Sequence, residues 1–366
     1  MRTPAPSLCW VELSGENPRL AREELRSVLR SLGEGALAPE PFPEPFVPVS
    51  GTSETTQREL ARRLAHARAL YRPLGEGGPA DIARLLGREG SQGATARLRV
   101  ARDEEGNRRE ACLRAWGDAY RTGGGRIDLT EPERVFRVVP GTQGPASYLL
   151  LEQVEVVDRT GFHARRPSQQ TFRQPVTLSP RLARTLVNLS ESPLGGTVLD
   201  PFCGTGAIPR EARLLGHPVV VSDRSAKMLR GTLQNLAAAG ISPETAWVAD
   251  VSELPGLLEG LPRVSALVTD PPYGRASSTG GEGLRELLAR LYAVLPAVVG
   301  AEGTGVLLLP HPDPGLPPPT GWRGEALGLA ERVHGSLSRY VYRLTGPDHA
   351  SREGTRAAAD GEPPLT

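Results

Sequence analysis

The hydrophobic and polar positions of this 366-residue chain predict a first region of mixed helices and strands. Apolar residues recur at helical spacing in two of its segments and alternate with polar residues, or run together, in others. The predicted elements are a strand over 8–13, a helix over 20–32, a Pro-rich loop over 39–48, a helix whose apolar face includes Leu60, Leu64, Ala67 and Tyr71, and strands over 96–100, 135–139 and 148–157. The second of these helices exposes Arg58, Arg62 and Arg72, which either contact an anionic partner or form a solvated face. Together these elements predict a small α+β unit.

The second region repeats strand and helix in alternation. Four apolar strands are predicted over residues 197–200, 218–223, 246–250 and 265–270, with helices over 181–189 and 208–215. Each strand ends in aspartate, and these aspartates lie 23, 27 and 20 residues apart. Such steps hold one strand and one helix each, which predicts a parallel, doubly wound sheet. The carboxyl ends of its strands share one edge, so the four carboxylates should line the rim where ligands bind.

The length of the chain favours two domains. We expect an N-terminal region over 1–145, a linker over 146–175, a second domain over 176–345 and a disordered tail over 346–366, where apolar residues are scarce. The apolar runs are too short to span a bilayer, and the first residues lack the apolar core of a signal peptide, so we expect a cytoplasmic protein and no membrane partner. The three cysteines are too dispersed to indicate a metal site.

Charge is unevenly distributed along the chain. Residues 51–190 hold 23 arginines against 16 acidic residues, whereas residues 191–366 hold 15 basic and 19 acidic residues. The net charge of +1 therefore hides a basic portion over residues 51–190. That portion is the candidate for contact with nucleic-acid phosphates.

A glycine loop follows the first of the four strands. The sequence Asp200-Pro201-Phe202-Cys203-Gly204-Thr205-Gly206 places glycines where backbone can approach a ligand closely. It lacks the third glycine of the dinucleotide fingerprint and the Lys-Ser/Thr ending of an ATPase loop. Asp223 is placed to accept hydrogen bonds from a ribose diol, and Asp250 can reach an adenine amino group. The arrangement suits S-adenosylmethionine, although any one of these aspartates alone could simply cap a helix.

The decisive motif is Asp270-Pro271-Pro272-Tyr273-Gly274, which ends the fourth strand. The lone pair of an amino group on a base is delocalised into the ring, so an enzyme that methylates it must accept hydrogen bonds from its N–H groups. The Asp270 carboxylate and the Pro271 carbonyl are suitable acceptors, Pro272 stiffens the turn, and Tyr273 offers a face on which an unstacked base can lie. Cys203 lies in the glycine loop and is interpreted as a packing residue rather than a nucleophile. The alternative is a plain proline turn.

These two motifs resemble those of the tRNA guanine-N2 methyltransferases with an N-terminal THUMP domain, most closely the archaeal family that dimethylates guanosine 10. The resemblance covers nearly all of the chain up to about Leu344 and is most specific at 198–206 and 270–274. Weaker matches lie at 12–16, 127–129, 173–175, 178–184 and 334–339.

The resemblance implies a class I, Rossmann-like methyltransferase domain with a mixed, mostly parallel sheet, preceded by an α+β, ferredoxin-like and THUMP-type RNA-binding region. The cofactor would be S-adenosylmethionine and the partner tRNA, whose acceptor end the first region would bind; we expect a monomer. In the family, the segment matching 177–182 helps to hold the methionine part of the cofactor, which makes Thr177 and Ser179 candidates. An N-cap on the following helix is the alternative. The chain departs from the family in a long, Gly-rich loop over 74–95.

Several other functions remain open on the sequence. The same chemistry could act on guanosine 6 of tRNA or on ribosomal RNA. Adenine-N6 methylation of DNA and glutamine-N5 methylation of a protein use a similar Pro-Pro-Tyr loop, but a THUMP-like first region disfavours both. An RNA-binding protein that has lost catalysis is disfavoured because Asp200, Asp223 and Asp270 are all present.

Overall fold

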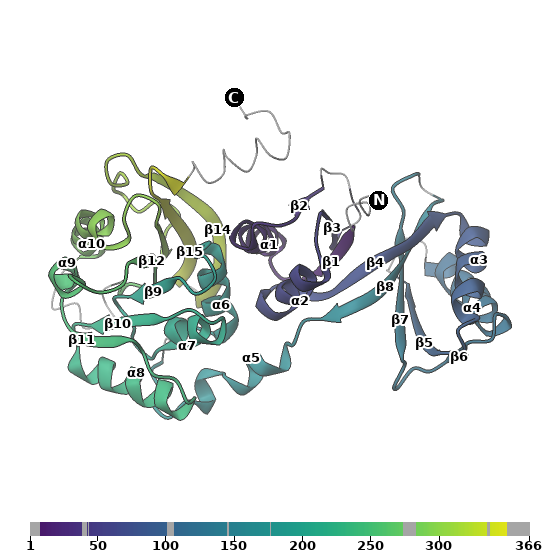
Figure 1. Cartoon of the computed structure of the whole chain (residues 1–366), viewed down its shortest axis with the longest axis horizontal. Helices are drawn as coiled ribbons and strands as arrows, with labels where there is room; N and C mark the ends of the chain where they lie inside the picture. The colour runs from purple at the N-terminus through teal and green to yellow at the C-terminus, as the bar shows by residue number, and fades with distance from the viewer. Residues whose placement is uncertain are drawn as a thin grey trace. The chain divides into compact units, whose positions relative to one another are not determined.

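The computed structural model describes residues 8–38, 42, 44–100, 106–144, 146–175, 177–273, 283–334 and 337–349. The chain forms two compact units (Figure 1). Unit 1 takes the chain up to Pro18, Gly33–Arg62 and Ala67–Asp158, and unit 2 takes Arg19–Leu32, Arg63–His66 and the chain from Arg159 onward. The division thus falls after the expected end of the first region, and a helix from that region belongs to unit 2. Gly274 and residues 350–366 of the expected tail lie outside the described residues.

Unit 1 is built on one eight-stranded sheet in the order β2-β3-β1-β4-β8-β7-β5-β6. Its elements are β1 Cys9–Leu13, β2 Ala36–Leu37, β3 Phe46–Ser50, α2 Glu54–Arg63, β4 Ala67–Gly77, α3 Pro79–Gly90, β5 Thr95–Val100, α4 Gly106–Thr122, β6 Arg126–Ile127, β7 Arg134–Pro140 and β8 Tyr148–Val156. The long strands β4 and β8 pair antiparallel along nearly their whole length. One apolar core packs α3 and α4 against alternate residues of β5 and β7, such as Leu98 and Phe136.

Three expectations for the first region are wrong. The helix predicted to reach Tyr71 ends at Arg63, because the N–H groups of Ala65 and His66 turn to the Glu24 carboxylate at 3.0 and 2.9 Å instead of continuing the helical ladder. Residues 67–77 are a strand, so Tyr71 and Arg72 lie on β4. The expected loop over 74–95 holds the end of β4 and all of α3, and the Pro-rich loop ends early, in β3.

Unit 2 contains a seven-stranded sheet in the order β11-β10-β9-β12-β13-β15-β14. Its elements are α1 Pro18–Leu32, α5 Thr160–Ala164, η1 Pro167–Gln169, α6 Pro180–Leu189, β9 Thr197–Asp200, α7 Ala207–Leu214, β10 Val219–Asp223, α8 Ala226–Ala238, β11 Thr245–Val248, η2 Val251–Glu253, α9 Leu254–Leu257, β12 Val264–Thr269, α10 Leu284–Val299, β13 Thr304–Leu309, β14 Arg323–His334 and β15 Leu337–Thr345. The strands β9 to β13 are parallel, and β15 runs antiparallel to both its neighbours. The expected Rossmann-like, mostly parallel sheet is confirmed, and its antiparallel strand makes it mixed.

Alternation along the strands divides the core of unit 2 into two layers. Val198 and Val268 face one layer, which contains α6 and α7, whereas Leu199 and Leu267 face the other, which contains α10. The helices therefore cover both faces of the sheet (Figure 1). Every strand of the parallel part is apolar on both sides, and only the strand ends are left for polar chemistry.

The helix α1 is an integral part of unit 2. Leu20 is buried in the same apolar cluster as Leu182 and Leu186 of α6. The Glu24 carboxylate is fully buried and accepts hydrogen bonds from the side chain of Asn188 at 2.8 Å and from two backbone N–H groups of the 63–66 segment. A buried carboxylate is tolerated when it is hydrogen-bonded in this way. In the described part of the chain, no helix has the length and apolar character needed to cross a bilayer.

Candidate active site

The predicted rim of carboxylates is present at the carboxyl ends of the parallel strands. Asp200 ends β9 and Asp223 ends β10, which are neighbours, and Asp270 follows β12, which pairs with β9 on its other side. Asp250 follows β11, which pairs with β10 up to Asp223. The four side chains therefore lie along one edge of the sheet in the order of its strands. In open α/β sheets this edge is where ligands bind.

Asp200 fastens the glycine loop to the neighbouring strand. Its Oδ1 accepts hydrogen bonds from the hydroxyl of Thr269 at 2.6 Å and from the N–H of Phe202 at 3.2 Å. The pKa of Asp200 is raised to about 7, mainly by burial; the two hydrogen bonds oppose this change, and the nearby carboxylates of Asp223 and Asp270 add to it. Pro201 is buried and Phe202 packs at the edge of the core behind it. Asp200 thus connects the glycine loop to the end of β12.

The loop itself has the backbone that its glycines predict. Gly204 and Gly206 have φ of +53° and +86°, values that other residues rarely adopt, and a Cβ on Gly206 would lie 3.2 Å from Thr232. The N–H of Gly204 donates to Asp223 at 3.2 Å. Cys203 is buried against Val221, and burial raises the pKa of its thiol well above the ordinary value, in agreement with a packing role. The loop can therefore bring backbone close to a ligand.

Asp223 and Asp250 have different surroundings. Asp223 accepts hydrogen bonds from the N–H groups of Gly204 and Ser225, and burial raises its pKa. Asp250 caps η2 by accepting from Ser252 and forms an ion pair with Arg290. Burial opposes ionisation of Asp250, but Arg290 and the Ser252 hydrogen bonds outweigh it and lower its pKa. The capping alternative is confirmed for Asp250, and contact with adenine stays a prediction.

Thr177 and Ser179 both make local hydrogen bonds. The Thr177 hydroxyl donates to the Gln174 carbonyl at 2.8 Å. The Ser179 side chain accepts from the Leu182 N–H at 3.2 Å and is the N-cap of α6. The capping alternative is thus confirmed for Ser179. Contact of either residue with the methionine part of the cofactor stays a prediction.

Asn235 is a supporting residue that the sequence did not reveal. Its buried side-chain amide donates to the carbonyls of Thr205 and Phe172, both at 2.9 Å, and accepts from the Phe172 N–H at 2.9 Å. Phe172 also packs close over Gly231, one turn earlier on α8. One amide therefore joins the glycine loop, α8 and the segment that precedes α6.

Replacement of Asn235 by alanine should lower the free energy of unfolding by about 2 kcal/mol, because it leaves buried backbone groups of Thr205 and Phe172 without partners. Urea denaturation of the whole chain measures this. Gln234→Ala is the matched control, since Gln234 is exposed on the same helix and should change stability by less than about 0.5 kcal/mol. Equal effects of the two changes would contradict the supporting role.

The Asp270 turn forms a compact polar cluster beside this loop. The Tyr273 hydroxyl donates to Oδ1 of Asp270, and the Arg339 guanidinium of β15 donates to Oδ2 at 3.1 Å. Arg339 also forms an ion pair with Glu331 of β14. Burial raises the pKa of Asp270, whereas the Arg339 charge and the Tyr273 hydrogen bond lower it. Tyr273 therefore turns its hydroxyl toward the carboxylate in this structure.

Two prolines follow Asp270 in this turn. Pro271 is buried and Pro272 is partly buried. Neither proline has an N–H group, so the turn presents carbonyls without donors of its own at these positions. Arg339 was noticed in the sequence only as the last residue of a weak motif, and its role beside Asp270 was not predicted.

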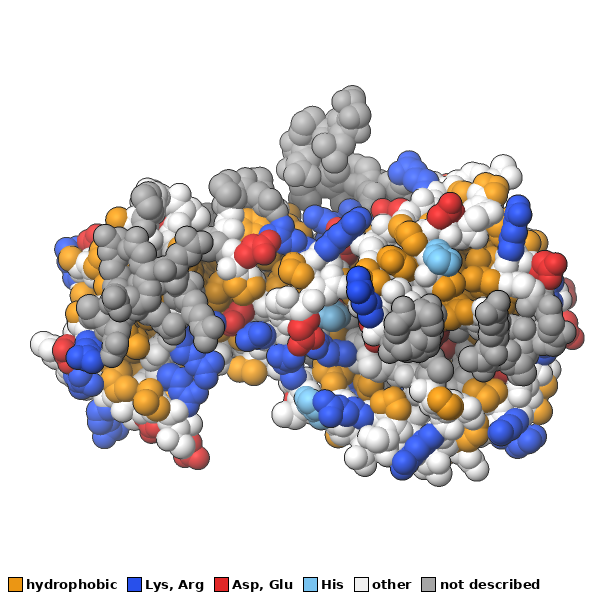
Figure 2. Space-filling model, turned by 180° about the vertical axis from the view of Figure 1, so that it is seen from behind, with side chains coloured by type: hydrophobic (Ala, Val, Ile, Leu, Met, Phe, Trp, Pro, Cys, Tyr) orange, Lys and Arg blue, Asp and Glu red, His pale blue; other side chains and the backbone are white. Residues whose placement is uncertain are grey.

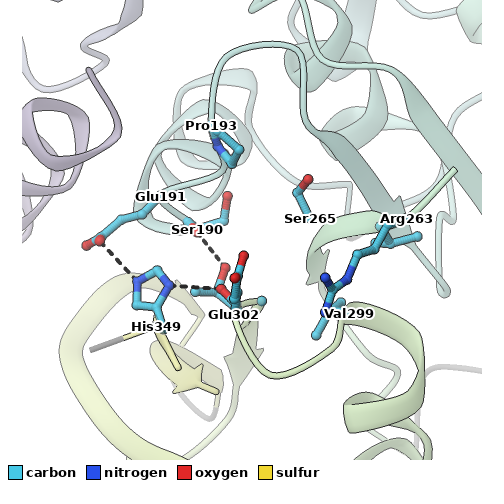
Figure 3. A pocket seen from close by; sticks show the side chains of 11 residues that line it. Ser190, Glu191, Pro193, Arg263, Ser265, Val299, Glu302 and His349 are labelled. Carbon is cyan, nitrogen blue, oxygen red and sulfur yellow. Dashed lines mark hydrogen bonds and ion pairs between the residues drawn. The ribbon is translucent and has the colours of Figure 1, made fainter. Parts of the chain in front are cut away.

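A cavity of about 60 Å³ lies at the opposite edge of the unit 2 sheet (Figure 3). It is lined by residues at the amino ends of strands, such as Ser265 and Thr304, and by Glu191 and His349. Glu191 accepts hydrogen bonds from Ser27 and Arg343 there. Because it lies at the amino ends of β12 and β13, away from the carboxylate rim at the carboxyl ends, this cavity is not the candidate cofactor site.

The arginines proposed to contact RNA form ion pairs at the surface of unit 1. Arg62 pairs with Glu59 at 2.8 Å and Arg72 with Glu152 at 2.6 Å, and both are well exposed. Figure 2 shows that basic side chains are spread over one face of the molecule with fewer acidic side chains among them. The exposed Arg62–Glu59 pair can release its guanidinium to a stronger anion at little cost, whereas Glu152 is buried and also pairs with Arg134. RNA contact by these residues stays a prediction.

Comparisons with known proteins show which family and fold this chain resembles. Residues 167–313 match the family model described as RMKL-like, methyltransferase domain. The tRNA (guanine(10)-N2)-dimethyltransferase of Methanothermobacter thermautotrophicus is 31% identical over 313 residues, which cover 82% of this chain and 88% of that protein. The tRNA (guanine(6)-N2)-methyltransferase of Thermus thermophilus is 30% identical over 165 residues, which cover 42% of this chain and 44% of that protein. The crystal structure of TrmN from Thermus thermophilus shares the fold, with a TM-score of 0.51, 23% identity and coverage of 93% of this chain and 99% of that chain.

Proposed function

Because this chain belongs to the family of the tRNA (guanine(10)-N2)-dimethyltransferases, we propose that it methylates the exocyclic N2 of guanosine 10 in tRNA, once and then a second time, with S-adenosylmethionine as the methyl donor. Relatives at position 10 and position 6 share guanine-N2 chemistry. Position 10 is favoured because the match to the position-10 enzyme spans 82% of this chain, against 42% for the position-6 enzyme.

The observation that carries the proposal is the juxtaposition of the glycine loop and the Asp270 turn on neighbouring strands. Thr269, the residue before Asp270, donates its hydroxyl to Asp200 at 2.6 Å, so the two motifs are joined directly. The left-handed backbone at Gly204 and Gly206 and the carboxylate of Asp223 fit a ligand that presents a ribose diol and a charged sulfonium group. An enzyme for amino methylation needs such a cofactor cradle within reach of hydrogen-bond acceptors for the amino group.

The residues of the site have separate tasks. S-adenosylmethionine, when bound, supplies a methyl group made electrophilic by its sulfonium sulfur. Gly204, Gly206, Pro201 and Phe202 shape its cradle, with Asp223 on the ribose, Asp250 toward the adenine, and Asp200, Thr177 and Ser179 at the methionine end. Asp270 and the Pro271 carbonyl accept hydrogen bonds from the N2–H groups of guanine, which localises the nitrogen lone pair. Asp270 then takes up the proton that N2 loses, and orientation supplies most of the rate.

Tyr273 links base binding to Asp270. Its hydroxyl donates to the Asp270 carboxylate in this structure, and its side chain is partly buried. We propose that an incoming guanine replaces this hydrogen bond with its own N2–H and that the Tyr273 ring then stacks on the base, which must leave its helix to reach the site. The first unit, with its α+β sheet, is the proposed THUMP-type binding surface for tRNA. We further propose that the enzyme acts in the cytoplasm as a monomer.

Labelling of the product tests the function directly. Purified protein is incubated with S-adenosylmethionine carrying a labelled methyl group and, separately, with tRNA, ribosomal RNA, DNA or a peptide pool, and the digested products are identified. We expect N2-methylguanosine and then N2,N2-dimethylguanosine from tRNA alone, and loss of the label when guanosine 10 of the tRNA is replaced by adenosine. Label in guanosine 6 or in ribosomal RNA would move the target, and label in adenine or glutamine would overturn the proposal.

A further inference from the structure

The cluster around Asp270 contains a buried arginine that neither the motif nor the cofactor cradle includes. Arg339 is only 3% exposed, lies on β15 and is 69 residues from Asp270 in sequence. One of its terminal nitrogens donates to Oδ2 of Asp270 at 3.1 Å, and the other faces Glu331. A guanidinium can serve two carboxylates at once in this way because its donors lie in a fixed planar fork.

The groups that face Asp270 act on its ionisation in both directions. Glu331 of β14 and Asp200 of β9 both repel a negative charge on Asp270, whereas the hydrogen bond from the Tyr273 hydroxyl favours that charge. Burial also favours the neutral acid. Arg339 supplies the opposing positive charge, and its hydrogen bond leaves Oδ1, the oxygen that Tyr273 contacts, on the other side of the carboxylate.

We propose that Arg339 is a positioning residue for methyl transfer: it holds the Asp270 carboxylate ionised and binds its Oδ2, so that Oδ1 is directed to the guanine amino group. This role rests on the proposed function, because it presumes that Asp270 accepts the N2–H groups of the target base. Arg339 does not itself touch the substrate. Its loss should therefore affect the rate and its pH dependence rather than the binding of cofactor.

The pH profile of single-turnover methylation of tRNA separates this role from a structural one. If Asp270 must be ionised, the rate falls at acid pH with the protonation of its carboxylate. Arg339→Met removes the opposing charge, so the acid limb of the pH profile should shift to higher pH by about one unit or more. The rate at neutral pH should fall by about 10-fold or more. Arg339→Lys keeps the charge but not the fork and should give a smaller displacement.

Glu331→Gln should shift the acid limb in the opposite direction, to lower pH. It removes a negative charge that disfavours ionisation of Asp270. Arg343→Met is the matched control, because Arg343 is a second buried arginine on β15 that pairs with Glu191 and Glu325 instead. That change should lower stability and leave the acid limb in place, and the Kd for S-adenosylmethionine should stay within about three-fold in all variants that fold.

The outcomes distinguish the two proposals. If the unaltered chain methylates no guanosine in tRNA, the proposed function fails. If it does so and the acid limb of Arg339→Met coincides with that of the unaltered chain, only the positioning role fails. Should Arg339→Met not fold, Arg339→Lys and Glu331→Gln decide: acid limbs displaced in opposite directions support the role, and any other result overturns it.

Discussion

Asp270→Asn should reduce the rate of methyl transfer by about 10³-fold, because an amide in place of the carboxylate cannot take up the proton from N2 and offers one acceptor instead of two. The change keeps the shape of the side chain, and Asp270 is not among the residues proposed for the cofactor cradle. The Kd for S-adenosylmethionine should therefore stay within a few-fold. Single-turnover methylation of tRNA gives the rate, and calorimetric titration gives the Kd.

The control is Asp313→Ala. Asp313 lies in the loop after β13, where it accepts a hydrogen bond from the Gly315 N–H at 2.8 Å, and it belongs to none of the contacts around Asp270. Its replacement should leave the rate unchanged. If Asp270→Asn keeps a rate within ten-fold of the unaltered protein, the acceptor role assigned to Asp270 is wrong.

The second large effect is expected on stability, at Glu191. Its buried carboxylate accepts hydrogen bonds from Arg343 at 2.7 Å and Ser27 at 2.9 Å, and Arg30 and His349 also contact it. Burial opposes ionisation, but these partners prevail, with the His349 hydrogen bond first, and hold the pKa of Glu191 at about 2. Glu191→Gln leaves Arg343 buried beside a neutral amide and should lower the free energy of unfolding at neutral pH by about 3 kcal/mol.

Protonation of the Glu191 carboxylate should destabilise the folded protein at acid pH. The folded pKa of about 2 lies below the ordinary value of 4.5, so the stabilisation is complete above about pH 4.5 and is lost as the pH falls toward 2. Glu191→Gln should therefore lose less stability than the unaltered chain between these values. Urea unfolding at pH 7 and pH 3 measures both effects.

Glu325→Gln is the control for this arginine. Glu325 also pairs with Arg343, but its side chain is 53% exposed, so its replacement should cost less than about 1 kcal/mol. An equal loss in the free energy of unfolding for Glu325→Gln and Glu191→Gln would contradict this explanation. It would mean that burial does not determine how much each ion pair stabilises the protein.

Features that repeat along the chain could be predicted, and features formed by distant residues could not. The four strands with terminal aspartates were located from periodicity, because each strand and its helix form one local unit. Asn188 and Glu24 meet across 164 residues, and Arg339 and Asp270 across 69, so no local pattern marks these pairs. The candidate site was therefore predicted as a set of strand ends, without the side chains that support them.

The errors in the first region have the same origin. The segment from Leu60 to Tyr71 keeps helical spacing of its apolar residues, yet the helix stops where Glu24 draws away the N–H groups of Ala65 and His66. A contact with a residue about forty positions earlier thus overrode the local pattern. The hairpin of β14 and β15 was not predicted because its strands carry many charged residues, which hide the apolar pattern of a strand. Two of them, Arg339 and Arg343, are buried and form ion pairs.

The position of α1 limits how this protein can be divided. The strands on either side of the helix in the sequence belong to unit 1, while the helix completes the core of unit 2. A protein shortened to begin at residue 159 would expose the apolar surface that Leu20 covers and leave Asn188 without the Glu24 carboxylate. Recombination that exchanged the first 158 residues between relatives would likewise replace part of the catalytic unit's interior. Unit 1 therefore cannot be exchanged along the sequence without changing the interior of unit 2.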